Sequence, residues 1–385
     1  MMKAQLAIVL ALAGFLLIFS PIVAQEADLN IEWTKVLDRE IDSLAVSPDG
    51  NRMAFSSRET STIAVIDWQR GESIWEVRED LGRDRGVEAQ VAWSPNDHYI
   101  ARIGSDGSLA IYSAPDGTRL EQIEAILNNV RIALTETSSG ELDSFTDLQW
   151  NADGTQLAVM VRSYIVVFDL RENTVERVVD PHVVPSSLHG HLSSFAWSPD
   201  GSKFAAYHFR IEDGQEAFPP EVVLGFWDRN GRWLREYEYS SGVDSDQNCV
   251  RYGGEIFEIR GLGLMGGWYE WSPNNVTIAM IESVITLNYQ AYSTCTLNPD
   301  GTLTVTQVGQ FAPRYIHWSS DGDKLFAISM DCSIYVTTEG GRGTTDLVAF
   351  DEPCLLRFAS WSGDDRYVVL GTENGLWVGE VAGYS

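Results

Sequence analysis

Short apolar runs alternate with turn-forming residues along most of this chain. In one clear example, the apolar Phe195-Ala196-Trp197 ends in Ser198-Pro199-Asp200-Gly201, and a second run leaves the turn at Lys203. Proline presets the backbone of a tight turn, aspartate can bond its own backbone, and glycine adopts the left-handed conformation that the turn needs. The pattern predicts two short strands joined by a hairpin.

This unit occurs seven times. The copies begin at Val46, Trp93, Trp150, Trp197, Trp271, Trp318 and Trp361. Four of the six intervals between them span 43–47 residues, and the other two span 57 and 74 residues. A period in the forties with occasional insertions is typical of a four-stranded β-propeller blade. We therefore expect an all-β fold: a single seven-bladed β-propeller with four-stranded antiparallel blades.

The second copy illustrates the four strands of a blade. Its β-rich runs, separated by turn residues, are Gln90–Trp93, Tyr99–Ile103, Leu109–Tyr112 and Arg119–Ile123. The third strands expected in the first, third and fourth copies are Ile63–Asp67, Ile165–Asp169 and Val222–Asp228. Runs of this length and composition indicate β-strands.

The two ends of the repeat region complement each other. The last copy supplies only three strands, near Phe358–Trp361, Arg366–Leu370 and Leu376–Val381. A β-favouring segment, Leu29–Leu37, precedes the first turn. We expect this N-terminal strand to complete the last blade and close the ring, which leaves no large sheet edge exposed.

The ends of the third strands suggest a family. The WD-repeat β-propeller proteins have a Trp-Asp pair at this point, and the chain has Ile66-Asp67, Phe168-Asp169 and Trp227-Asp228. It also has Gly190-His191, which resembles the Gly-His element of that family. The chain departs from this pattern at Tyr112-Ser113, Tyr335-Val336 and Val378-Gly379. The Ser-Pro-Asp-Gly turns are also similar to those of TolB-like propellers and of the propellers attached to prolyl peptidases. The resemblance implies a propeller over nearly the whole chain.

The N-terminus has the features of a secretory signal peptide. Met1-Met2-Lys3 precedes an apolar run from Ala4 to Phe19, and a small residue, Ala24, precedes the polar Gln25. A charged start, a short apolar region and a small residue at the cut are typical of such a leader. We expect residues 1–24 to be removed and residues 25–385 to form the propeller in an extracytoplasmic location, secreted or periplasmic. A retained membrane anchor is the alternative.

The chain is strongly acidic. It has 385 residues, with 27 Lys and Arg against 55 Asp and Glu, which gives a formal net charge of −28. Such a surface repels phosphate backbones, so we expect no nucleic-acid partner. No later apolar stretch is long enough to span a bilayer, and we expect the mature chain to be a monomer without a membrane span.

The four cysteines predict disulfides in an exported protein. The pairings favoured here are Cys249–Cys295 and Cys332–Cys354, among three possible connectivities. Cys332 falls at the tip between the second and third strands of one blade, and Cys354 falls in the connection to the next blade. In a propeller these two kinds of loop emerge on the same rim.

Four insertions are expected on that same rim. They are Glu124–Thr146, Asp180–His189, Phe209–Glu221 and Ser240–Gly267. Long loops on a rigid scaffold often form binding surfaces, although they can also simply cover apolar edges. Within and after the largest insertion, the candidate binding aromatics are Tyr252, Phe257, Trp268 and Tyr269.

A group of histidines is a candidate metal site. His189 and His191 would lie on one side of an extended strand, and His208 would end the adjacent strand. Imidazoles with this spacing can bind zinc. The alternative is structural, because His191 occupies the position of the Gly-His element of the family it resembles. We expect no metal or other cofactor.

No catalytic motif for hydrolysis, phosphate binding or dinucleotide binding occurs in the chain. We therefore expect an exported, non-catalytic scaffold that binds a protein or peptide on its insertion-rich rim. The alternative is a secreted propeller enzyme, such as a lactonase or other hydrolase. Such an enzyme would need at least two convergent titratable residues in a pocket at the mouth of the central channel.

Overall fold

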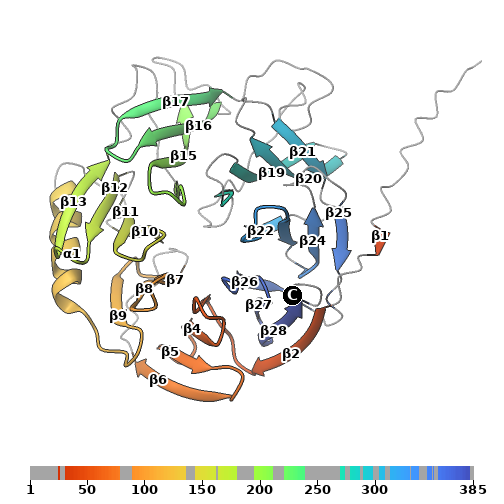
Figure 1. Cartoon of the computed structure of the whole chain (residues 1–385), viewed down its shortest axis with the longest axis horizontal. Coiled ribbons are helices and arrows are strands. Elements are labelled where there is room, and N and C mark those ends of the chain that lie inside the picture. Colours follow the sequence, from red (N-terminus) through yellow and green to blue (C-terminus); the bar gives the residue numbers. More distant parts are fainter. Residues whose placement is uncertain are drawn as a thin grey trace, which may run out of the picture.

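The computed structural model describes the repeat region with gaps. The described residues are 25–26, 31–78, 89–135, 144–161, 164–179, 195–210, 221–238, 269–273, 278–286, 289–297, 303–307, 313–329, 331–337, 345–348, 350 and 354–381. They form a ring of β-sheets around a central opening (Figure 1), so the chain is an all-β β-propeller. The expected signal peptide, residues 1–24, lies outside the described residues.

Seven sheets are found among the described residues, and five of them have four strands. The first of these five consists of β3 (Ser43–Val46), β4 (Arg52–Ser57), β5 (Thr62–Asp67) and β6 (Glu72–Arg78). The next consists of β10 (Phe145–Trp150), β11 (Gln156–Val161), β12 (Tyr164–Asp169) and β13 (Thr174–Val179). The strands within each sheet are antiparallel and consecutive in the chain.

Two further sheets repeat this order. One contains β14 (Phe195–Trp197), β15 (Lys203–Arg210), β16 (Glu221–Asp228) and β17 (Trp233–Glu238). The other contains β18 (Tyr269–Trp271), β19 (Ile278–Thr286), β20 (Tyr289–Leu297) and β21 (Leu303–Gln307). The third strands expected from the sequence are therefore confirmed as β5, β12 and β16.

The expectation of four strands in every sheet is wrong for the second repeat. Its sheet has three strands, β7 (Gln90–Trp93), β8 (Tyr99–Ile103) and β9 (Leu109–Ser113). Where a fourth strand was expected at Arg119–Ile123, a single bridge joins Tyr112 to Arg119, and helix α1 (Glu121–Thr135) follows. This helix occupies much of the expected insertion Glu124–Thr146.

The helix forms because its apolar residues recur at helical spacing, which buries one face. Ile123 and Leu127 are buried in the core, and Val130 and Leu134 pack against it. Glu121 and Glu124 lie in the first turn, where acidic side chains interact favourably with the positive end of the helix dipole. The buried Glu124 carboxylate also accepts a hydrogen bond of 2.9 Å from the backbone N–H of Ile111, so the helix covers the outer edge of β9.

The sixth repeat gains a strand. Its sheet contains β22 (Pro313–Trp318), β23 (Leu325–Ser329), β24 (Ile334–Thr337) and β25 (Thr345–Val348). The two-residue β1 (Gln25–Glu26) adds to β25 in parallel, with Gln25 opposite Asp346. This sheet therefore has five strands instead of four.

The N-terminal segment closes the ring, as expected. The last sheet contains β26 (Leu356–Trp361), β27 (Tyr367–Thr372) and β28 (Gly375–Val381). Its outer strand is β2 (Ile31–Leu37), which pairs antiparallel with β28 from Ile31 opposite Val381 to Leu37 opposite Leu376. Figure 1 shows β2 running along the outside of β28.

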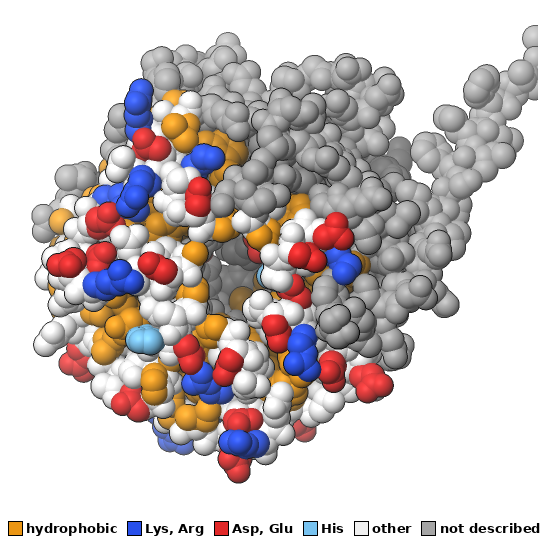
Figure 2. Space-filling model, viewed as in Figure 1, with side chains coloured by type: hydrophobic (Ala, Val, Ile, Leu, Met, Phe, Trp, Pro, Cys, Tyr) orange, Lys and Arg blue, Asp and Glu red, His pale blue; other side chains and the backbone are white. Residues whose placement is uncertain are grey.

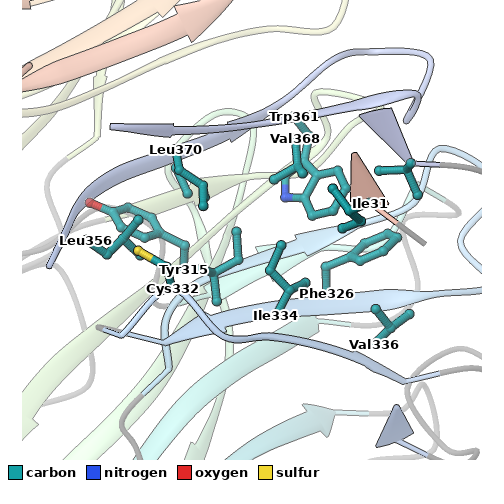
Figure 3. Close-up of a cluster of buried hydrophobic side chains, with 13 residues drawn as sticks. Ile31, Tyr315, Phe326, Cys332, Ile334, Val336, Leu356, Trp361, Val368 and Leu370 are labelled. Carbon is teal, nitrogen blue, oxygen red and sulfur yellow. The ribbon is translucent and has the colours of Figure 1, made fainter. Parts of the chain in front are cut away.

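Neighbouring sheets are held together by shared apolar clusters. Figure 3 shows the cluster between the β22–β25 sheet and the β26–β28 sheet, where Phe326 and Ile334 face Trp361 and Leu370. Ile31 of β2 belongs to the same cluster. The ring centroids of Phe326 and Trp361 lie 4.1 Å apart. Burial of such side chains contributes about 1.5–3 kcal/mol each, so the closing strand is anchored by packing as well as by backbone pairing.

Polar side chains of the inner strands bond the following sheet. Ser43 Oγ accepts from the N–H of Val91 (2.8 Å), Gln90 Oε1 from Leu148 (3.2 Å) and Asp147 Oδ2 from Phe195 (3.0 Å). Each acceptor stands three residues before the first residue of its turn copy. The repeat thus places a side-chain acceptor at the same point of three successive sheets.

Three of the six repeated tryptophans bond in the opposite direction. The indole N–H groups of Trp150, Trp271 and Trp318 donate to backbone carbonyls of the preceding sheet, over 3.1–3.3 Å. The acceptors are the residues directly before the preceding tryptophan, namely Ala92, Ala196 and Glu270. Each indole therefore couples adjacent sheets while its ring fills the space between them.

The turns have the geometry that the sequence predicts. Gly50 and Gly201 have φ angles of 73° and 68°. Ser47 Oγ donates to Asp49 Oδ1 over 2.6 Å and accepts from the N–H of Arg52 over 2.9 Å. Burial raises the pKa of Asp49, but the hydrogen bonds from Ser47 and Asn51 outweigh this effect and lower the pKa below 3.8.

One expected disulfide is confirmed. Cys332, in the tip between β23 and β24, is bonded to Cys354, in the connection from β25 to β26. The cysteines are 22 residues apart, and a loop of this length corresponds to about 3 kcal/mol in the chain-entropy account. The pair Cys249–Cys295 stays a prediction, because Cys249 and the side chain of Cys295 lie outside the described part.

The contact between Asp147 and Phe195 gives a test of inter-sheet coupling. We expect Asp147→Ala to lower the free energy of unfolding by about 1–3 kcal/mol, because the buried N–H of Phe195 loses its acceptor. Urea denaturation followed by circular dichroism measures this change. The exposed Asp323→Ala serves as the control, and equal stability of the two variants would contradict a structural role for Asp147.

Candidate functional site

A cleft lies on one rim of the propeller, between the first and the last repeat. Its volume is about 720 Å³, and it is open to solvent. It is lined by Lys35 and Trp377 on the paired strands β2 and β28, by the β2–β3 connection, by the β4–β5 tip and by the β27–β28 tip. Outer-to-inner connections and tips between second and third strands form the rim on which the sequence places the binding loops.

The space-filling view in Figure 2 shows the charged side chains of one face of the ring. Acidic and basic groups are interspersed over the described blades around the central opening. On the described part of this face, the acidic groups are therefore not gathered into one patch.

The aromatic wall of the cleft is firmly supported. Trp377 packs edge-on against Phe350 with centroids 5.3 Å apart, and Phe350 packs in the same way against Trp33 at 4.9 Å. Gly375 has a φ of 132°, and a Cβ there would lie 2.2 Å from the carbonyl oxygen of Leu37. The tip therefore needs glycine, and the indole is held in a fixed position beside the solvent.

Two of the charged side chains in the cleft are held by groups outside it. The Arg39 guanidinium lies 4.6 Å from the Phe55 ring centroid and 3.9 Å from Glu76 Oε2. Glu40 Oε1 lies 3.1 Å from the guanidinium of Arg357. These contacts attach the β2–β3 connection to the sheets on either side.

Lys35 and Asp38 form a pair inside the cleft. The Lys35 Nζ is 2.5 Å from Asp38 Oδ1 and 5.6 Å from the centroid of the Trp377 ring. Lys35 lies opposite Trp377 in the strand register. An exposed ion pair of this type contributes at most about 1 kcal/mol, so the ammonium is held weakly.

The remaining charges in the cleft are negative. Glu59 lies on the β4–β5 tip and Glu373 on the β27–β28 tip, and both are exposed. Among the described residues, neither carboxylate has an ion pair or a side-chain hydrogen bond. The described lining residues include two cationic and four anionic side chains, so this part of the lining has a negative balance.

A second group of titratable residues lies on the inner strands. His317 of β22 has its Nδ1 3.3 Å from Glu270 Oε1 and its Nε2 3.7 Å from Asp365 Oδ1. Glu270 belongs to β18, and Asp365 belongs to the turn after β26. The imidazole stacks on Trp361 with an interplanar angle of 10°. Three successive sheets therefore meet at one histidine.

The charges around His317 determine its protonation. Burial lowers the pKa of His317, but the Glu270 carboxylate, with Asp365, outweighs burial and raises the pKa from 6.5 to about 9. The ring is therefore cationic at neutral pH. Each of its nitrogens faces a carboxylate of the protein, so the arrangement is suited to joining sheets and poorly suited to general-base catalysis.

Asp365 itself is held by the adjacent turn. Its φ is 59°, in the left-handed region that glycine occupies in most other copies, and its Oδ2 accepts a 2.7 Å hydrogen bond from the N–H of Ser320. Asp97 has the equivalent position in the second copy, with a φ of 64°, and pairs with Arg52 of the preceding sheet. Both aspartates replace the turn glycine and bond the preceding repeat.

Most of the sequence-predicted binding aromatics lie outside the described residues. These are Tyr252, Phe257 and Trp268. Tyr269 begins β18, where its backbone pairs with Met280, and its side chain is not described. Their proposed role stays a prediction, as do the insertions Asp180–His189 and Ser240–Gly267.

Of the three histidines proposed as a metal site, only His208 lies among the described residues. His189 and His191 lie outside the described residues, and His208 lies within β15, opposite Val223, with its side chain undescribed. Within the described portion, no group of three or more His, Cys, Asp or Glu side chains has the arrangement of a metal site. In that portion, too, no helix is long and apolar enough to cross a bilayer.

Sequence reasoning missed both the cleft and the His317 group. The position before each repeated tryptophan held a usable signal, because Ala92 and Ala196 occupy it in two copies whereas Glu270 and His317 occupy it in two others. Because this position holds Ala, Gln or Ser in the other copies, a titratable side chain there marks a special contact. The cleft gave no such signal, because its two halves are far apart in the chain.

Comparison with known proteins gives distant relatives. No protein-family model matches the chain. It is 24% identical to a component of chicken chromatin assembly factor 1 over 167 residues, which is 40% of this chain and 28% of that protein. It is 21% identical to Protein HIR1 of Candida albicans, over 78% of this chain and 32% of that protein. It is 20% identical to Protein HIR1 of Eremothecium gossypii, over 79% of this chain and 38% of that protein. The chain thus spans about a third of their length.

Among solved structures, the chain resembles a chain of the Kuenenia stuttgartiensis hydrazine synthase. The TM-score is 0.61, with 13% identity, over 91% of this chain and 97% of the other. At this identity the likeness concerns the fold alone.

The pKa of His317 predicts a pH-dependent contribution to stability. Because the folded-state pKa is raised, the contribution is fully present below pH 6.5 and is lost as the pH rises through about 9. We expect the difference in unfolding free energy between the parent and His317→Gln to be about 2 kcal/mol near neutral pH, discounted for partial exposure, and to shrink above pH 9.

Urea titrations at a series of pH values measure this difference. His98→Gln, at an exposed histidine of another turn, is the control variant. A difference between the parent and His317→Gln that stays constant across the alkaline range would contradict the assignment.

Proposed function

We propose that the chain is an exported, non-catalytic scaffold, on the premise that WD-repeat proteins are distant homologues of this propeller. It binds a protein or peptide partner on the rim that carries the cleft. In this proposal the ring is a seven-bladed support, and the loops and tips of one rim provide the recognition surface.

The cleft is the observation that carries the proposal. It has a volume of about 720 Å³ and brings together the β2–β3 connection and two strand tips from different sheets. A fixed indole beside exposed charges offers apolar contact and orientation together, a combination typical of binding pockets. The opening to solvent suits a partner that remains largely outside the protein.

A non-catalytic role is supported by the His317 group. An enzyme at the channel mouth would need titratable side chains with a free face toward a substrate. His317 has one carboxylate beside each ring nitrogen, and Asp365 is further bonded by the Ser320 N–H. The polar atoms of this group are thus engaged with one another and with the backbone.

Export is supported by the leader-like N-terminus and by the position of β1. A cut after Ala24 would leave Gln25 as the first residue and keep intact the pairing of β1 with β25. The Cys332–Cys354 disulfide is of the kind that persists in oxidising compartments. The mature chain would therefore act outside the cytoplasm.

A steric block of the cleft tests the binding role. Immobilised parent protein, Asn374→Trp and the control Asn230→Trp are incubated with extract of the native host, and retained proteins are identified by mass spectrometry. Asn374 lines the cleft, whereas Asn230 is exposed in the β16–β17 turn. We expect a partner retained by the parent and the control to fall about tenfold or more with Asn374→Trp. Equal retention by all three would contradict the proposal.

Terminal sequencing tests export. The protein recovered from native cells is expected in the extracytoplasmic fraction, with Gln25 as its first residue, because the leader is removed after Ala24. Recovery of chains that begin at Met1, in the cytoplasmic fraction alone, would be the contrary result.

A further inference from the structure

The chemistry of the rim cleft points to one class of occupant. The cations of its lining are already engaged: Arg39 is turned toward Phe55 and Glu76, and Lys35 pairs with Asp38. An anionic ligand would meet a lining with twice as many carboxylates as cations, on a chain with a net charge of −28. The cleft therefore disfavours anions and favours cations.

The cleft already holds one ammonium group. The Nζ of Lys35 lies over the ring of Trp377, at 5.6 Å from its centroid, and beside the carboxylate of Asp38. The face of an indole attracts cations through its quadrupole, and a neighbouring carboxylate adds to this attraction. The contact shows that this wall is compatible with a primary amine on an alkyl chain.

Two carboxylates in the cleft are left for a second cation. Glu59 and Glu373 come from different sheets and line the same space, and within the described residues neither is neutralised by a cation of the chain. A lysine or arginine side chain has an apolar stem and a charged end. The stem suits the edge of Trp377, and the charged end suits the two carboxylates.

We propose that the cleft binds a lysine or arginine side chain of a basic polypeptide segment, with its cation paired to Glu59 and Glu373 and its alkyl stem against Trp377. This inference rests on the proposed function, because it takes the cleft as the partner-binding surface and names the chemistry of the partner. The net charge of the chain attracts such a segment over longer distances and accelerates its association.

Binding of defined peptides to the full chain tests the proposal. The probes are short fluorescein-labelled peptides of glycine and serine that carry lysine, arginine or glutamate at matched positions, and binding is followed by fluorescence anisotropy. The test variant is Glu59→Gln with Glu373→Gln, which removes two charges from exposed positions and keeps their shape. The matched control is Glu72→Gln with Glu172→Gln, which removes the same charge from exposed positions near the third-to-fourth strand turns of two sheets.

We expect the lysine and arginine peptides to bind and the glutamate peptide not to bind. The Glu59→Gln/Glu373→Gln variant should weaken binding of the basic peptides about tenfold, and the matched control should leave it nearly unchanged. Unchanged affinity in the test variant, or an equal loss in both double variants, would overturn the proposal, because the second result would assign the effect to net charge alone.

A free polyamine distinguishes the source of the cation. Spermidine is titrated as a competitor against the lysine peptide. A much weaker affinity for spermidine than for the peptide supports a polypeptide ligand. Tighter binding of spermidine, lost in the Glu59→Gln/Glu373→Gln variant, would overturn the polypeptide assignment and make the cleft a site for small amines.

The two proposals can fail separately. If Asn374→Trp abolishes partner capture and the double glutamine variant does not, the cleft is the binding surface but its occupant is not basic, and this inference fails alone. If neither variant changes capture, the proposed function fails as well.

Discussion

The antiparallel pairing of β2 with β28 is the constraint on which the rest of the structure depends. It gives the last sheet its outer strand and joins the first described residues of the repeat region to the last ones. Ile31 contributes to the apolar cluster that packs the β22–β25 sheet against the last sheet. Because a closed ring has no free end, the edge of β28 is covered, and each sheet can be supported by its neighbours.

The inner strands carry a second level of order. The position three residues before each turn copy supplies acceptors to the next sheet in Ser43, Gln90 and Asp147, and several repeated tryptophans donate backward to the preceding sheet. His317 stands at another repeated position, directly before Trp318, and lies between carboxylates of the sheets on both sides. Neutral and ionic side-chain contacts at different positions of the repeat therefore both join neighbouring sheets.

The two groups of charged residues differ in whether their charges have partners within the described part of the protein. Around His317, each charge has an internal partner, so the group stabilises the ring. In the rim cleft, Arg39 and Glu40 attach the β2–β3 connection to adjacent sheets. By contrast, no cation among the described residues forms an ion pair with Glu59 or Glu373. The charges around His317 therefore hold neighbouring sheets together, whereas the carboxylates of Glu59 and Glu373 are exposed at the rim.

The sequence by itself determined the repeat, the hairpin turns and the closing strand, because each depends on local turn chemistry or on the order of strands along the chain. It favoured the pairing of Cys332 with Cys354 among three possible connectivities, and the structure confirms that pair. It misplaced a strand at Arg119–Ile123, where Ile123 and Leu127 begin a helical spacing that the repeat pattern concealed. Only the tertiary structure decided the cleft and the His317 group. Lys35 and Glu373 come from opposite ends of the chain, and Glu270, His317 and Asp365 come from three sheets, so their proximity is set by closure and by the stacking of sheets, which no local pattern encodes.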